Sequence, residues 1–140
     1  MILVDSSVWI SFFNAQQNVQ ATVLKTLIEN DEDVCLSVHI LMEILQGFRA
    51  DKEFRQVYEY LRMFPIVDLG GMPSYVAAAQ VYRRCRKKGI TIRRGMDCII
   101  AQTAIENDLV LLHDDADFDR LSSVIPLKIY QDTHEPFSHR

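Results

Sequence analysis

Two acidic residues follow directly after short apolar runs that are typical of buried strands. Asp5 comes after residues 2–4 (Ile-Leu-Val), and Asp115 lies in the acidic turn 113–117 that follows residues 110–112 (Val-Leu-Leu). Short apolar strands that alternate with helices favour a parallel sheet, and ligand sites in such sheets form beyond the carboxyl ends of the strands. We therefore expect Asp5 and the acidic turn to meet at one edge of the sheet.

Two further acidic residues lie on predicted helices. Asp97 is in the first turn of a helix expected over residues 95–106, where the helix dipole favours a carboxylate. Glu43 lies beside the apolar stripe of a helix expected over residues 38–49, and it should face partly inward. Capping or exposure to solvent explains each of the four acids equally well when it is taken alone. Their combination predicts a metal site, because carboxylates gathered in one cleft repel one another unless a hard cation such as Mg²⁺ or Mn²⁺ neutralises them.

The charged residues are unevenly distributed along the chain. The formal charge is -4, from 15 Lys and Arg against 19 Asp and Glu, so removing the four candidate acids leaves 15 of each sign. Seven of the basic residues lie within residues 83–94, which contain no acid. Such a block can neutralise phosphates, although the dipole at a helix C-terminus also favours basic residues there. The candidates for contacts to nucleic acid are Arg83, Arg84, Arg86, Lys87, Lys88, Arg93 and Arg94.

Apolar periodicity predicts strands and helices that alternate along the chain. Strands are expected at residues 2–4, 33–36, 66–69, 110–112 and 127–130. Helices are expected at residues 8–13, 19–30, 38–49, 53–63, 73–89 and 95–106, with a short helical piece after the acidic turn. Ser6 and Ser7 offer N-caps to the first helix, and residues 91–94 form a loop. The pattern predicts an α/β fold with a short, mostly parallel central sheet flanked by helices.

Length and composition limit the class of protein. A chain of 140 residues with 49% hydrophobic and 24% charged residues is typical of one globular domain, expected over residues 1–130 and followed by a flexible polar tail at 131–140. No apolar run is long enough to cross a bilayer, and an acid at position 5 comes too early for a signal peptide, which predicts a cytoplasmic protein. Cys35, Cys85 and Cys98 lack metal-site spacing, and all three are expected to be buried apolar side chains.

Four segments of the chain together resemble a known family. They are residues 2–9 (ILVDSSVW), 42–45 (MEIL), 97–101 (DCIIA) and 115–118 (DADF). No single segment is specific, but the ordered set spans nearly the whole chain and resembles the PIN-domain ribonucleases, in particular the VapC toxins. The resemblance implies a PIN-like domain and a Mg²⁺- or Mn²⁺-dependent endoribonuclease that leaves 5′-phosphate and 3′-hydroxyl ends. Structured RNA such as tRNA is then a candidate substrate.

The resemblance also implies roles for individual residues. The catalytic residues would be four acids: Asp5, Glu43, Asp97 and Asp115. All of these except Glu43 would hold the metal, and Asp117 and Ser7 would be accessory. We further expect a VapB-like antitoxin whose C-terminal segment blocks the site, and a homodimer. His113 departs from the threonine that is frequent in the family, and Met96 from a small polar residue.

The acidic turn leaves open which of its acids belongs to the site. Asp114, Asp115 and Asp117 lie within four positions, and the spacing to Phe118 in the family's pattern favours Asp115. Asp114 is then expected to face solvent. His113 is expected to be packed or hydrogen-bonded, since a single histidine at a strand end is more often structural than catalytic. The aromatic residues near the first strand, Trp9, Phe12 and Phe13, are expected in the core or at a subunit interface.

Three other functions compete with a nuclease. A phosphorelay receiver domain has a similar length and an acidic magnesium pocket, but residues 50–60 are predicted helical and Lys128 lies inside a strand. A serine hydrolase using Ser6 or Ser7 with His113 would lack the GxSxG elbow, and helix capping explains both serines. A non-catalytic binding module of the same fold should have lost acids from the set, and all four are present.

Overall fold

The computed structural model describes residues 1–131, so the predicted tail from residue 132 onward lies outside the described residues. Five strands of the described chain form one parallel sheet in the order β3-β2-β1-β4-β5. The strands are β1 (Ile2–Val4), β2 (Val34–Ser37), β3 (Ile66–Val67), β4 (Val110–Leu112) and β5 (Lys128–Ile129). The prediction of an α/β fold with a short parallel central sheet is confirmed.

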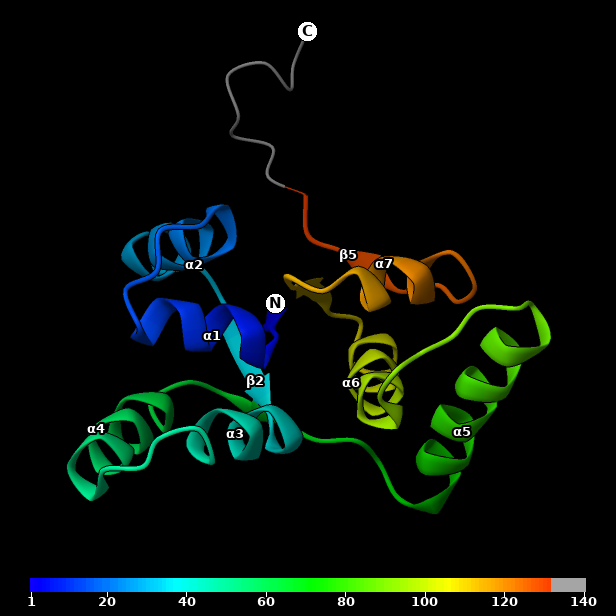
Figure 1. The fold of residues 1–140 in the computed structure, drawn as a ribbon, viewed down its shortest axis with the longest axis horizontal. Coiled ribbons are helices and arrows are strands. Elements are labelled where there is room, and N and C mark those ends of the chain that lie inside the picture. The colour runs from blue at the N-terminus through cyan, green and yellow to red at the C-terminus, as the bar shows by residue number, and fades with distance from the viewer. Residues whose placement is uncertain (132–140) are drawn as a thin grey trace, which may run out of the picture.

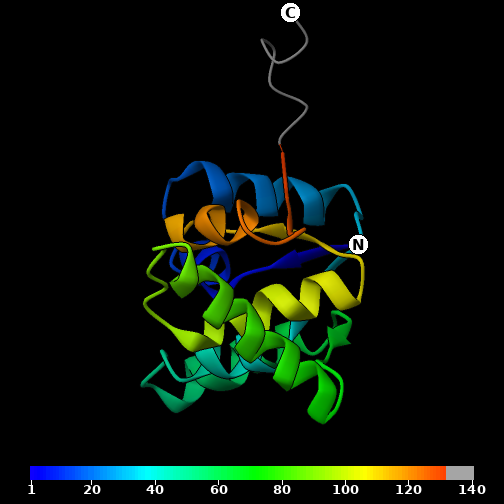
Figure 2. The same ribbon diagram turned by 90° about the vertical axis from the view of Figure 1, so that its right-hand side faces the viewer.

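Helices connect successive strands and cover both faces of this sheet. They are α1 (Ser6–Phe13), α2 (Val19–Glu29), α3 (Val38–Leu45), α4 (Asp51–Leu61), α5 (Met72–Lys87), α6 (Gly95–Glu106) and α7 (Ala116–Ser122). In Figure 1, α1 and α2 lie on one side of the sheet and α5 and α6 on the other. Figure 2 looks onto the side formed by α5 and α6, which pack against each other. No helix among residues 1–131 is long and apolar enough to cross a membrane.

The core lies where the central strands meet the first helices that follow them. Leu3, Val4 and Leu111 of β1 and β4 are completely buried, which explains why these strands are continuous apolar runs. Trp9 and Phe118 are the largest fully buried side chains, and they lie on α1 and α7. Both helices begin directly beside candidate site acids, so core packing fixes where those acids stand.

Most predicted element boundaries agree with the structure to within a few residues. The helix at 95–106 and the strands at 2–4 and 110–112 agree at both ends. The helix predicted over 38–49 ends earlier, at Leu45, because the chain turns there through Gly47, whose amide donates to the Ile44 carbonyl. Gly89 ends the long α5 segment with a φ of +76°, a conformation that glycine adopts without strain. All three cysteines are buried and free, as predicted.

One predicted cap is wrong. The N-cap of α1 is Asp5, and Ser6 and Ser7 lie in the first turn of the helix instead of before it. The Asp5 carboxylate accepts a hydrogen bond from the Ser7 amide at 3.3 Å, which satisfies an amide that the helix itself leaves unpaired. The serine hydroxyls are thereby free to bond to carboxylates of the candidate site.

Candidate active site

The pairing of β1 with β4 brings two of the predicted acids to one edge of the sheet. Val4 and Leu112 are partners in the parallel ladder, and the Asp5 amide donates to the Leu112 carbonyl at 2.9 Å. Asp115 follows β4 by three residues and caps α7, accepting a hydrogen bond from the Asp117 amide at 3.0 Å. The predicted convergence of Asp5 and the acidic turn is therefore present in the fold.

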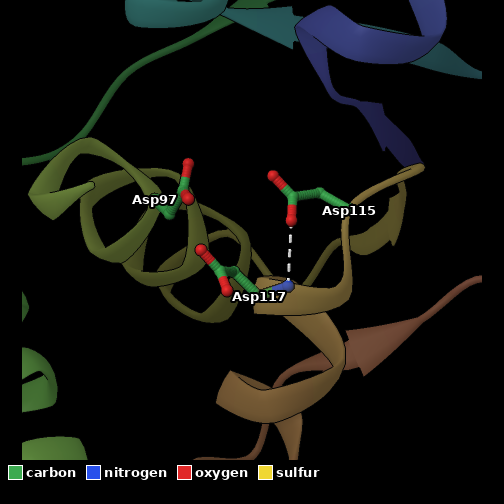
Figure 3. Close-up of side chains that lie close together, drawn as sticks. All are labelled: Asp97, Asp115 and Asp117. Carbon is green, nitrogen blue, oxygen red and sulfur yellow. Dashed lines mark hydrogen bonds between the residues drawn. The ribbon is translucent and has the colours of Figure 1, made fainter. Parts of the chain in front are cut away.

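Three carboxylates form a close cluster beyond the end of β4. Asp97, Asp115 and Asp117 each offer an oxygen atom, and these atoms lie within 4.8 Å of one another. Figure 3 shows Asp97 reaching in from α6, and Asp115 and Asp117 from the start of α7, with their carboxylates turned toward a shared space. This cluster contains Asp97 and Asp115 of the expected metal set, with Asp117 in the place of Asp5.

Asp5 and Glu43 join this cluster from the side of α1 and α3. The Ser7 hydroxyl donates to Asp5 Oδ2 at 2.8 Å, and the Ser6 hydroxyl donates to Glu43 Oε1 at 3.2 Å. The charge of Asp5 helps raise the pKa of both Glu43 and Asp97, and the charge of Asp115 helps raise the pKa of Asp97, as expected for acids that lie close together. The sequence predicted a capping role for Ser6, and its contact with Glu43 was not predicted. The signal available in the sequence was the position of Ser6 between Asp5 and Ser7 in the run DSS.

Burial is the main perturbation of the site acids. Asp97 is completely buried, and this raises its pKa to about 6 even though the neighbouring Arg94 acts to lower it. Burial likewise raises the pKa of Asp5 and of Glu43. Asp117 behaves differently: burial acts to raise its pKa, but hydrogen bonds from Arg93 and the charges of Arg93 and Arg120 hold it below its usual value. Burial thus disfavours the charged forms of Asp5, Glu43 and Asp97.

Among residues 1–131, two buried carboxylate oxygens have no hydrogen-bond donor. They are Asp5 Oδ1 and Asp97 Oδ2, from side chains that are 1% and 0% exposed. A buried carboxylate oxygen without a partner is costly, since it has lost its water and gained nothing in return. Oxygen atoms of this kind are the ligands that Mg²⁺ and Mn²⁺ prefer. The donor set therefore fits a hard divalent cation.

Two arginines of the basic block reach into this acidic site. Arg93 contacts Asp115 at 3.0 Å and Asp117 at 3.1 Å, and Arg120 of α7 also pairs with Asp117. Arg94 contacts Glu43 at 3.2 Å and Asp97 at 2.9 Å. The sequence placed both Arg93 and Arg94 among the candidate nucleic-acid contacts, and it did not predict that they would pair with the site acids.

The rest of the basic block lies apart from the acids and is exposed. It comprises the last turns and C-cap of α5: Arg83, Arg84, Arg86, Lys87 and Lys88. A cleft of about 840 Å³ lies between the loop that follows α5 and the start of α7, lined by residues that include Gly89, Thr91, Arg93, Asp115 and Asp117. An extended anionic chain could therefore pass from the basic helix end to the carboxylates.

The other residues of the acidic turn have structural roles. The His113 side chain is 6% exposed, and its Nδ1 accepts a hydrogen bond from the Asp115 amide at 3.0 Å. Its Nε2 lies 3.1 Å from Asp119, and its ring packs against Phe118. Asp114 is exposed. His113 is thus packed and hydrogen-bonded, and Asp114 faces solvent, as expected.

Neither the nearby aromatic residues nor Lys128 contributes to this site. Trp9 stacks on Phe13 with ring centroids 5.9 Å apart and also contacts Phe64, so it belongs to an aromatic part of the core. Lys128 pairs at 2.7 Å with Asp108, which precedes β4 and so lies at the opposite edge of the sheet from Asp5. A receiver domain needs a lysine beside its acidic pocket, and Lys128 does not provide one.

Comparison with known proteins gives a consistent result. The family model described as PIN domain matches residues 2–124. A VapC ribonuclease of Mycobacterium bovis and ribonuclease VapC11 of Mycobacterium tuberculosis are each 32% identical to this chain over 129 residues, which is 91% of this chain and 96% of theirs. The similarity therefore extends over nearly the full length of both proteins.

Solved structures share the same fold at lower sequence identity. The VapBC2 structure from Rickettsia felis, bound to a promoter DNA fragment, superposes with a TM-score of 0.73 at 17% identity and covers 93% of this chain and 98% of its own. FitAcB from Neisseria gonorrhoeae also has a TM-score of 0.73, at 24% identity, and covers 96% of this chain and 100% of its own. Family model, relatives and fold agree: the chain belongs to the PIN domain family and, within it, to the VapC group.

Proposed function

We propose that this protein is a divalent-metal-dependent endoribonuclease that acts as the toxin of a toxin–antitoxin pair. The observation that carries the proposal is the pair of buried, unpartnered oxygens, Asp5 Oδ1 and Asp97 Oδ2, within a group of four acids. A cation bound at this edge of the sheet would offset the cost of burying carboxylate oxygens that have no hydrogen-bond donor. The names of the relatives, VapC ribonuclease and ribonuclease VapC11, support RNA as the substrate.

The site residues would have three roles: some hold the cation, one orients a carboxylate, and one accepts a proton. Asp5, Asp97 and Asp115 would hold Mg²⁺ or Mn²⁺, which when bound supplies Lewis acidity toward a phosphodiester oxygen and lowers the pKa of a water. Glu43 has a pKa raised by burial and by Asp5, and it is suited to accept the proton of the attacking water. Ser7 fixes the orientation of Asp5 through its 2.8 Å hydrogen bond. The products would carry 5′-phosphate and 3′-hydroxyl ends.

Asp117 and the basic residues would position the substrate. Both oxygens of Asp117 already accept hydrogen bonds from arginines, so we assign it to anchoring these side chains instead of binding the cation. The exposed basic residues at the end of α5 would neutralise RNA phosphates leading into the cleft. Because RNA is the substrate, we propose that the protein acts in the cytoplasm.

Two protein partners are part of the proposal. The structural neighbours that share this fold include VapBC complexes, which supports a VapB-like antitoxin as the cognate inhibitor. A second copy of the chain would cover exposed apolar side chains of α3 and of the N-terminal half of α5: Val38, Met42, Met72, Tyr75 and Val76. The His39 and Tyr75 rings, whose centroids lie 6.4 Å apart, bring the two helices together on this face.

The test is RNA cleavage by purified protein free of any antitoxin. We would incubate total RNA with the protein and Mg²⁺ or Mn²⁺, add EDTA to a parallel sample, and map new 5′ ends by sequencing. Discrete cuts should require the cation and should disappear in Asp5→Asn and Asp97→Asn. Removing an acid that holds a catalytic cation should lower the rate by at least about 100-fold.

The acidic turn supplies a matched control. Asp114→Asn changes the same residue type one position before Asp115, at an exposed side chain, and should keep full activity while Asp115→Asn loses it. Cutting that survives the Asp5 and Asp97 substitutions would argue against the carboxylate site. No cutting of any RNA by folded, cation-loaded protein would favour the non-catalytic binding module.

A further inference from the structure

The guanidinium of Arg94 lies among the four acids of the candidate site. Arg94 is the N-cap residue of α6, and its guanidinium reaches back across the site to Glu43 Oε2 at 3.2 Å and to Asp97 Oδ1 at 2.9 Å. The same guanidinium lies 3.9 Å from Asp115 Oδ2, and its charge acts to lower the pKa of Asp5. One side chain of the protein itself therefore interacts with all four acids to which we assign catalysis.

Arg94 offsets the negative charge of the site, but it does not donate a hydrogen bond to every buried carboxylate oxygen. The guanidinium bonds to one oxygen of Asp97, while the second oxygen of Asp97 and one oxygen of Asp5 remain buried without a donor. A planar guanidinium presents its N–H groups in a fixed fork, so it does not reach every oxygen of a ring of carboxylates as a spherical cation does. Arg94 thus offsets the repulsion among the acids and leaves coordinating oxygens unused.

Within residues 1–131, the hydrogen bonds and ion pairs of the Arg94 side chain all go to acids of the site. Its side chain is 48% exposed and makes no capping hydrogen bond to the amides of α6, so it can leave without disrupting the helix start. Its neighbour Arg93 is held differently, because Asp117 accepts from both its backbone amide at 3.4 Å and its side chain at 3.1 Å. Asp117 therefore anchors the loop through Arg93, so the Arg94 side chain can leave the acids without breaking that anchor.

We infer that Arg94 is an intramolecular competitor of the catalytic cation. In the cation-free protein it holds Glu43 and Asp97 together, and a divalent cation must displace it from both to bind. The inference rests on the proposed function, since it assumes that these acids bind a cation. It makes two linked predictions: Arg94 weakens cation binding, and Arg94 stabilises the protein only while the cation is absent.

The experiment measures cation affinity and stability in the full chain. We would determine the affinity for Mn²⁺ by isothermal titration calorimetry for the wild type, Arg94→Gln and Arg120→Gln, and the melting temperature of each in EDTA and in saturating Mn²⁺. Arg120→Gln is the matched control, because it removes an equal charge from an arginine that pairs with Asp117 alone. It separates direct occupation of the site from the general effect of one positive charge nearby.

We expect Arg94→Gln to bind Mn²⁺ about tenfold more tightly than the wild type, and Arg120→Gln to stay within about threefold of it. Arg94→Gln should also melt at a lower temperature than the wild type in EDTA, with the difference reduced in saturating Mn²⁺. Arg94→Lys, which keeps the charge but not the forked donors, should have intermediate affinity, and it carries the test if the glutamine variant fails to fold.

Unchanged or weaker Mn²⁺ binding by Arg94→Gln would overturn the inference, as would an equal gain in Arg120→Gln. In both cases the wild type still binds Mn²⁺, so the proposed function stands. If neither the wild type nor Arg94→Gln binds Mn²⁺, the proposed metal site is wrong, and the competitor role falls with it.

Discussion

Individual side chains of the site carry two functions at once. Asp5 ends a strand, caps α1 through the Ser7 amide, and still directs one unpartnered oxygen into the acidic cluster. Asp115 does the same at the start of α7, where it caps the helix and takes part in the cluster. Helix capping therefore orients these carboxylates, so capping and membership of the site are compatible explanations for the same residue.

Replacement of Ser7 by alanine tests whether its hydroxyl orients Asp5 or attacks the substrate. The change removes one 2.8 Å hydrogen bond to Asp5 and leaves the acid in place. A hydrogen bond to a carboxylate is worth about 1.5 kcal/mol, so we expect RNA cleavage to fall only about tenfold in a single-turnover assay. Complete loss of activity in a folded Ser7→Ala protein would instead support a nucleophilic serine.

Cation affinity should depend on pH because protons and the cation compete for Asp97. Its pKa in the cation-free protein is raised to about 6, so the carboxylate is charged at pH 7 and mostly protonated at pH 5. Affinity for Mn²⁺ should therefore fall by at least about tenfold between pH 7 and pH 5, with Asp5 and Glu43 adding to the loss because their pKa values are raised as well. Calorimetry at several pH values measures this, and an affinity that is constant over the range would contradict it.

At the scale of elements, the site is held together by the loop between α5 and α6. This loop is tied to α7 by Asp117, which is completely buried and bonds to Arg93 and Arg120. The two arginines are 68% and 52% exposed, so water screens part of each ion pair. The hydrogen bonds to the buried carboxylate nevertheless fix the loop that carries Arg94 relative to the acidic turn.

Loss of the Asp117 charge should destabilise the fold. Asp117→Asn weakens several hydrogen bonds to a charged group, and we expect the free energy of unfolding to drop by about 2 kcal/mol in urea denaturation. The pKa of Asp117 is lowered in the folded protein, so its contribution is present above the unfolded value of 3.8 and is lost as pH falls through the folded value. The two proteins should therefore become more alike in acid. Asp114→Asn is the control and should change stability by less than about 0.5 kcal/mol.

At the scale of the whole molecule, α3 and the N-terminal half of α5 carry several exposed apolar side chains. Met72 and Val76 of α5 are 80% and 54% exposed, and Met42 of α3 is 52% exposed. Single exposed apolar residues are common, but several on two helices that are linked by the His39–Tyr75 ring contact are typical of an interface. This face is where we expect the second copy of the chain.

Self-association can be tested by introducing a charge on this face. Val76→Glu should shift the protein from dimer to monomer in size-exclusion chromatography with light scattering, because a carboxylate would be buried at the interface. Val19→Glu is the matched control, since Val19 is 64% exposed on α2, on the other side of the sheet, and should leave the dimer intact. A wild-type protein that is monomeric at all concentrations would contradict the prediction.

The sequence by itself determined the fold class, most elements and the acids that converge. Short apolar strands ending in Asp5 and in the acidic turn carry local information about burial and strand ends, and parallel pairing follows from the alternation with helices. The motifs around Glu43 and Asp97 contributed to the resemblance to the PIN domain family. These features could be predicted because each depends on neighbouring residues or on a general rule of sheet topology.

Only the tertiary structure decided how charges pair across the site. Ser6 with Glu43, Arg94 with Glu43 and Arg93 with Asp117 join residues that are 37, 51 and 24 positions apart. Seven basic residues looked like one block in the sequence, yet a sharp turn at Gly89 sends two of them into the acids and leaves four on α5 and one at its C-cap. A side chain's partner depends on the direction of the chain after each turn and on burial, and neither quantity is encoded in the spacing of residue types.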